Sequence, residues 1–151
     1  TADHTPEYAR SEFFRSQMGV YAVPLAFYST TFESGIRMNE IAQHIDILPT
    51  CLALANDSIS EVFSFGRNVF DTTEKPFTVN YISGVYQYSD GKSVIRHDGT
   101  KAIGWFDFEN DPNLKENLIQ QKSTDEPNFK RFEALLQQYN NRMIHNRLTT
   151  R

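Results

Sequence analysis

The sequence has little cysteine, no long apolar run and no excess of basic residues. Each of these absences argues against one class of protein. One cysteine, Cys51, in 151 residues cannot form an internal disulfide, so the chain is not a disulfide-stapled scaffold. No run of about 18 apolar residues occurs, which excludes a bilayer-spanning helix within the sequence. The 15 basic residues are outnumbered by 19 acidic ones, which argues against nucleic acid as a partner, because that affinity comes from Lys and Arg.

What is present is the composition of one folded unit or a piece of one, with 39% hydrophobic and 23% charged residues. The first half contains an apolar stretch over residues 20–28, which is rich in β-branched and aromatic side chains. We expect a buried strand there from about Leu25, because Pro24 is tolerated at the start of a strand.

A helix is predicted from Asp46, where apolar residues begin to recur at helical spacing. Asp46 is suited to the N-cap, and its carboxylate is expected to accept the free N–H group of Leu48 or Thr50. Pro49 is compatible with the first helical turn. We expect Cys51 to lie on the apolar face of this helix as a buried and inert thiol. The residues of that face are Ile47, Leu48, Cys51, Leu52, Leu54 and Ala55.

The second half predicts an antiparallel meander followed by a long helix. Alternating runs at residues 77–83, 85–89, 92–97 and 101–108 are separated by Ser-Gly or Asp-Gly pairs, which suit tight hairpins. Residues 111–118 are typical of a turn with a short helical piece. Residues 128–148 carry apolar side chains at intervals of three and four, which predicts a helix with one stripe facing the protein.

The main candidates for a functional site are Asp3 and His4, which are adjacent near the start of the sequence. Carboxylate oxygen and imidazole nitrogen are both ligands for divalent metal ions. By itself the pair is more typical of two solvated residues at the end of a chain, because a metal site needs three or four ligands and the pair supplies two. The other histidines, His44, His97 and His145, are interpreted as surface or packing residues, because no second ligand stands at metal spacing around them.

Several strings occur in an order that resembles a known family: TADHT, YAVPLAFYS, HIDILPTCLALA, FGRNVF, WFDFENDPNLKENL and YNNRMIHNRLT. They resemble the carboxy-terminal part of the sulfatase-like branch of the alkaline phosphatase superfamily. The resemblance is strongest to the membrane-anchored lipoteichoic-acid-synthase-like phosphoglycerol transferases of Bacteroidetes. It implies an α/β fold in which residues 1–75 end the main sheet region, while residues 76–151 form an antiparallel subdomain and the terminal helix.

The resemblance also implies a site. Asp3 and His4 would bind a catalytic divalent ion (Mn, Zn or Ca), together with an acidic residue and a nucleophile from an upstream part of the same protein that includes a membrane anchor. Thr5, Thr50 and Cys51 do not stand at the nucleophile position, so the chain alone is expected to be inactive. Candidates for contact with the anionic substrate are Tyr8, Arg10 and Arg15, and Arg suits phosphate or sulfate because its planar fork donates two parallel hydrogen bonds.

The expected function is therefore metal-dependent transfer or hydrolysis at a phosphate or sulfate ester, lipid- or glycan-linked, on the periplasmic or extracellular side of the cell membrane. Phosphoglycerol transfer or phosphodiester hydrolysis is preferred, because the resemblance is greater to that branch. Two alternatives remain open at this point. One is a true sulfatase acting on sulfated glycans, and the other is a non-catalytic binding or packing module.

Overall fold

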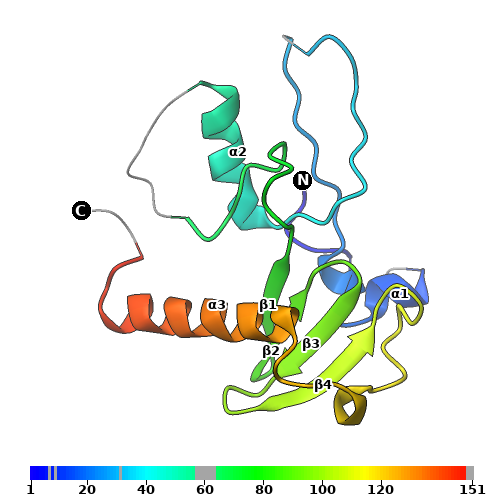
Figure 1. Ribbon diagram of the computed structural model, residues 1–151. Coiled ribbons are helices and arrows are strands. Elements are labelled where there is room, and N and C mark those ends of the chain that lie inside the picture. The colour runs from blue at the N-terminus through cyan, green and yellow to red at the C-terminus, as the bar shows by residue number, and fades with distance from the viewer. Residues whose placement is uncertain (7, 9, 31, 57–63, 149–151) are drawn as a thin grey trace.

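Four antiparallel strands form the one sheet in the described part of the chain (Figure 1). The computed structural model describes residues 1–6, 8, 10–30, 32–56 and 64–148. The strands β1 (Thr78–Ile82), β2 (Val85–Ser89), β3 (Ser93–His97) and β4 (Ala102–Asp107) lie side by side in chain order. The chain is thus a mixed α/β structure with an antiparallel meander, as predicted.

The hairpin turns follow the residue types that the sequence offers. Between β1 and β2, Ser83 and Gly84 have φ values of 50° and 85°, so both central residues adopt the left-handed conformation that a type I′ turn requires. Gly91 and Gly99 supply positive φ in the next two turns. The predicted positions of all three turns are confirmed.

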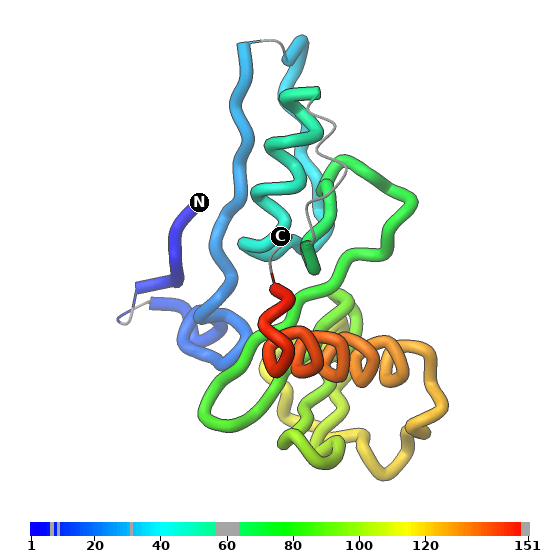
Figure 2. The backbone as a smooth tube through the Cα atoms, turned by 90° about the vertical axis from the view of Figure 1, so that its left-hand side faces the viewer, coloured from blue at the N-terminus to red at the C-terminus, as the bar shows by residue number. Residues whose placement is uncertain are grey.

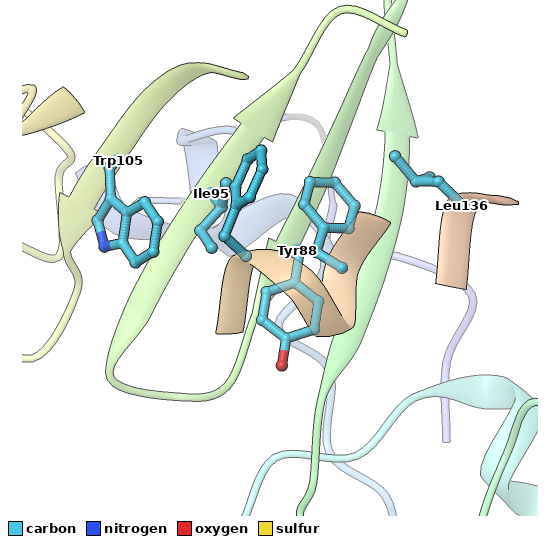
Figure 3. Close-up of a cluster of buried hydrophobic side chains, with 6 residues drawn as sticks. Tyr88, Ile95, Trp105 and Leu136 are labelled. Carbon is cyan, nitrogen blue, oxygen red and sulfur yellow. The ribbon is translucent and has the colours of Figure 1, made fainter. Parts of the chain in front are cut away.

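The core lies between the sheet and helix α3 (Pro127–Ile144). Tyr88 is opposite Ile95, and Ile95 is opposite Trp105, so these three side chains share one face of the sheet (Figure 3). Phe132 of α3 stacks on Tyr88 with 5.3 Å between ring centroids, and Phe129 of α3 stacks on Trp105. Each fully buried apolar side chain contributes roughly 1.5–3 kcal/mol, so this cluster fixes α3 on the sheet.

Helix α3 is shorter than predicted, and only its first half is covered. It ends at Ile144 rather than residue 148. Phe129, Phe132 and Leu136 are buried, whereas Met143 and Ile144 are exposed, because the helix runs past the edge of the sheet (Figure 1). No helix in the described ranges is long and apolar enough to cross a membrane.

The opposite face of the sheet is covered by the segment that contains the short helix α1 (Glu12–Arg15) and the 3-10 turn Gly19–Tyr21. Gln87 of β2 donates to the Gln17 carbonyl and accepts from Nε of Arg96 at 3.0 Å. The Arg96 guanidinium lies over the Phe106 ring, 5.0 Å from its centroid. The Gln87–Gln17 hydrogen bond joins the N-terminal segment to the sheet, and Phe13 of α1 lies against Phe108, with 6.4 Å between ring centroids.

The strand expected from Leu25 does not form, and this prediction is wrong. The chain is extended there and Val23, Leu25 and Phe27 are half-buried while their neighbours are exposed. No backbone hydrogen bond joins residues 24–28 to other described residues. Figure 2 shows the chain running out along residues 22–30 and back along residues 33–43. An alternating pattern makes a strand only where a neighbouring strand completes the ladder.

The helix expected after Asp46 is confirmed, but its burial is not. A 3-10 turn, η2 (His44–Asp46), leads into helix α2 (Ile47–Leu54). The side of α2 that was expected to be covered is largely open, with Leu48 and Leu54 exposed. Cys51 is also exposed, so the prediction of a buried thiol is wrong, because none of the described elements covers that side of the helix.

The predicted N-cap at Asp46 is wrong, because its side chain does not accept a hydrogen bond from the first turn of α2. Asp46 is 2% exposed, and its carboxylate accepts the backbone N–H of Gln43 through Oδ2 and that of Arg67 through Oδ1, both at 2.9 Å. The Thr50 hydroxyl donates to the Asp46 carbonyl at 2.6 Å and accepts from the N–H of Val69 at 3.1 Å. Asp46 and Thr50 thus join the start of α2 to a distant loop.

The loop approaches α2 so closely that residue 66 must be glycine. A Cβ on Gly66 would lie 2.0 Å from the Ile45 carbonyl oxygen, a distance that no real side chain tolerates. Beside it, the buried Arg67 guanidinium donates to the Asp71 carbonyl at 3.2 Å and pairs with Glu40 at 3.2 Å. These contacts join residues 40–50 to residues 66–71 without a sheet.

We predict that Asp46→Ala lowers the free energy of unfolding by about 2–4 kcal/mol, because two N–H groups in a buried setting lose their acceptor. Asp46→Asn should still cost about 1–3 kcal/mol, since one amide oxygen cannot accept both groups and the amide nitrogen faces a donor. Urea denaturation measures both. The matched control is Asp98→Asn, whose exposed carboxylate also accepts two backbone N–H groups that water can satisfy. An Asp46→Asn protein as stable as the wild type would contradict the bridging role.

We also predict that the chain self-associates through residues 24–28, because an extended segment with no backbone hydrogen bond to other described residues is a template for strand addition. Light scattering over a concentration series should show growing mass. Ala26→Pro should reduce association, since it removes one backbone donor at an exposed position. A monodisperse monomer at high concentration would refute this.

Candidate metal centre

Asp3 and His4 form a tight turn in which both side chains reach solvent. The backbone N–H of His4 donates to Asp3 Oδ1 at 3.0 Å, and the other oxygen, Oδ2, lies 3.5 Å from His4 Nε2. Their side chains are 86% and 59% exposed, respectively. The two candidate ligand atoms are therefore adjacent, accessible and on the same side of the turn.

The orientation of the His4 ring is set by a backbone carbonyl. His4 Nδ1 lies 2.7 Å from the carbonyl oxygen of Thr5. Because a carbonyl oxygen can only accept, Nδ1 carries the hydrogen, and in the neutral ring the lone pair is on Nε2. A ring N–H donated to a carbonyl is the usual support of a metal-binding histidine.

The distance between the two candidate ligand atoms suits a shared metal ion. Two ligands at about 2.1 Å from a tetrahedral ion are about 3.4 Å apart. The 3.5 Å between Asp3 Oδ2 and His4 Nε2 is close to this value. The same distance also fits an ion pair with a protonated imidazole, for which a metal ion would compete.

Thr5 anchors this turn to the rest of the protein. It is 7% exposed, and its N–H donates to the Val20 carbonyl at 3.0 Å. Its hydroxyl donates to the Phe14 carbonyl at 3.1 Å. Sequence reasoning only placed Thr5 outside the nucleophile position. The anchoring role required knowledge of which carbonyls lie nearby.

The electrostatics of the turn favour the ionised carboxylate. The pKa of Asp3 lies below its ordinary value, first because the backbone N–H of His4 donates to the carboxylate. The charges that His4 and His44 can carry lower it further. Asp3 is therefore an anionic ligand at neutral pH.

The pair is not completed by a third side chain among the residues that the structure describes. No group of three or more His, Cys, Asp or Glu side chains is placed there to hold a metal ion. The donor set, one carboxylate oxygen and one imidazole nitrogen, fits Zn or Mn chemically. It supplies two of the ligands that such a site needs.

The expected anion-binding residues lie on the surface near the start of the chain. Tyr8 is 90% exposed, Arg10 is exposed, and Arg15 is exposed at the end of α1. None of the three makes a hydrogen bond or ion pair with another described residue. Their neighbours Glu7 and Ala9 lie outside the described residues.

An open groove of about 1180 Å³ begins beside the pair. Thr1 and His44 line one part of it, and Phe27, Phe70 and Val79 line other parts. Buried donors at Gln43 Nε2 and Arg67 Nε have no acceptor among the described residues. Gln43 and Arg67 are among the residues that line the groove, but these two nitrogen atoms are themselves buried.

Comparisons of the chain with protein-family models, with curated proteins and with solved structures find no significant match.

Proposed function

We propose that this chain is the carboxy-terminal part of a metal-dependent, sulfatase-like phosphoglycerol transferase or phosphodiester or sulfate-ester hydrolase of the cell envelope. The order of the family-like strings motivates the proposal. The observation that carries it is the placement of Asp3 Oδ2 and His4 Nε2, 3.5 Å apart, with the His4 ring fixed by the Thr5 carbonyl.

Each residue of the turn has a distinct part in the proposal. Asp3 supplies an anionic oxygen, His4 supplies the Nε2 lone pair, and Thr5 keeps the ring in the binding orientation. A bound divalent ion (Mn, Zn or Ca) would supply Lewis-acid polarisation of an ester oxygen. The acidic ligand and the nucleophile would come from residues outside this sequence.

The residues proposed to contact the substrate are the exposed basic and aromatic residues that follow the Asp3–His4 turn in sequence. Arg10 and Arg15 are exposed, and Tyr8 is exposed beside them. A guanidinium can donate two parallel hydrogen bonds to a phosphate or sulfate group. A lipid- or glycan-linked ester is the substrate class that a membrane-anchored enzyme of this kind would meet.

The finer fold assignment is part of the same proposal. In an alkaline-phosphatase-like fold, residues 22–29 would become a strand of the larger sheet. The alternating burial of Val23, Leu25 and Phe27 and the absence of backbone partners for residues 24–28 among the described residues support this assignment.

We predict that the chain alone binds Mn²⁺ or Zn²⁺ weakly, because two protein ligands leave the other coordination positions to water. Calorimetric titration should detect this binding, and Asp3→Asn or His4→Ala should abolish it. His145→Ala is the matched control, since His145 is another exposed histidine with one ring nitrogen bonded to a backbone carbonyl.

Two results would contradict the proposal in different ways. Binding that persists in Asp3→Asn and His4→Ala, or no binding in the wild type, would show that the pair is not a metal site. Submicromolar binding that His4→Ala abolishes would show that this chain already contains a complete ligand set, so that the site needs no residues from outside it.

A further inference from the structure

His44 connects the helix entry to the metal-binding turn. Its Nε2 lies 2.8 Å from the carbonyl oxygen of Ala2, 42 residues away in sequence. Because a carbonyl oxygen only accepts, Nε2 carries the hydrogen and donates it. We propose that His44 is a positioning residue, which holds the backbone of Ala2 so that Asp3 and His4 keep their mutual geometry. This inference rests on the proposed function for its consequence in metal binding.

His44 can act in this way because its own backbone is fixed. It is the first residue of η2, and the turn is closed by the N–H of Asp46, which donates to the Gln43 carbonyl at 2.9 Å. The buried Asp46 carboxylate in turn accepts the backbone N–H of Gln43 at 2.9 Å. The imidazole of His44 therefore projects from a rigid base, although the ring itself is exposed.

The Asp3–His4 turn is consequently held on both sides. On the C-terminal side, Thr5 is bonded to the Val20 and Phe14 carbonyls. On the N-terminal side, the Ala2 carbonyl accepts from His44 at 2.8 Å and from the hydroxyl of its exposed neighbour Thr1 at 3.3 Å, and of these two donors only His44 ties the turn to a distant part of the chain. A ligand pair that is ordered before binding loses less conformational entropy when the metal ion arrives.

The ordering role can be tested without any metal. In ¹⁵N relaxation of the full 151-residue chain, the Asp3 and His4 amides should have order parameters near those of rigid backbone, about 0.85. His44→Ala should lower them below about 0.6, the range of flexible backbone. His44→Gln should keep them high, because its amide N–H stands in the place of Nε2–H. His145→Ala serves as the control that removes a histidine elsewhere.

The consequence for the site is tested by Mn²⁺ affinity, measured from the electron paramagnetic resonance signal of the free ion. His44→Ala should weaken binding about two- to tenfold, which corresponds to the loss of one hydrogen bond, and His44→Gln should restore it. Unchanged order parameters in His44→Ala, or low values in the wild type, would overturn the positioning role.

Direct ligation by His44 would also overturn it, and has a different signature. Both variants would then lose affinity together, and the visible spectrum of bound Co²⁺ would change in each. Failure of the proposed metal-binding function would give a third result, different from loss of the positioning role and from direct ligation by His44. In that case Asp3→Asn and His4→Ala would leave Mn²⁺ binding unchanged, while the order parameters would still decide whether His44 holds the turn.

Discussion

The buried carboxylate of Asp46 is the interaction on which the sheet-free half of the described chain depends. Residues 40–56 and 64–71 form no strand, so no ladder satisfies their backbone groups. The carboxylate takes two of those groups, the N–H of Gln43 and the N–H of Arg67. By doing so it joins the turn before α2 to the loop that contains Gly66. A carboxylate is suited to this bridge because it is an acceptor at both oxygens.

The second half, from β1 to α3, is stabilised mainly by strand pairing and the burial of apolar side chains. Its strands satisfy one another's backbone groups, and the Tyr88, Ile95 and Trp105 side chains bury apolar surface against Phe129 and Phe132 of α3. Within the sheet, tight turns join strands that are neighbours in sequence, and the hydrophobic effect then holds α3 on the sheet across 24 to 44 residues, as in the Trp105–Phe129 and Tyr88–Phe132 pairs. The two halves meet through contacts such as the hydrogen bond from the Val79 N–H to the Gln43 side chain.

This contrast explains which parts of the fold could be predicted. The four strands and the start of α3 follow from alternation, glycine turns and helical periodicity, which are local signals. The strand at Leu25 was expected from the same kind of signal, yet a strand also needs a neighbour, which a local pattern does not supply. Cys51 was expected to be buried because apolar spacing marks a face but does not say whether another element covers it.

The candidate metal site could likewise be predicted only in part. Asp3 and His4 could be singled out because of their residue types and a family resemblance. The role of Thr5, and the contact of His44 with Ala2 across 42 residues, could not be read from spacing. Both depend on which backbone carbonyls the fold brings near. Asp46 stood in a helix-entry pattern, and its bridge to Arg67 was missed because the partner lies 21 residues away.

In the proposed function, Asp3 and His4 are a pair of ligands for one ion. The most direct measurement is a crystal structure of the chain soaked in Mn²⁺, with the ion located by its anomalous scattering. We predict a peak about 2.1 Å from both Asp3 Oδ2 and His4 Nε2, with His4 Nδ1 still bonded to the Thr5 carbonyl. An ion bound elsewhere, or bound through His4 Nδ1 with the Thr5 contact broken, would contradict it.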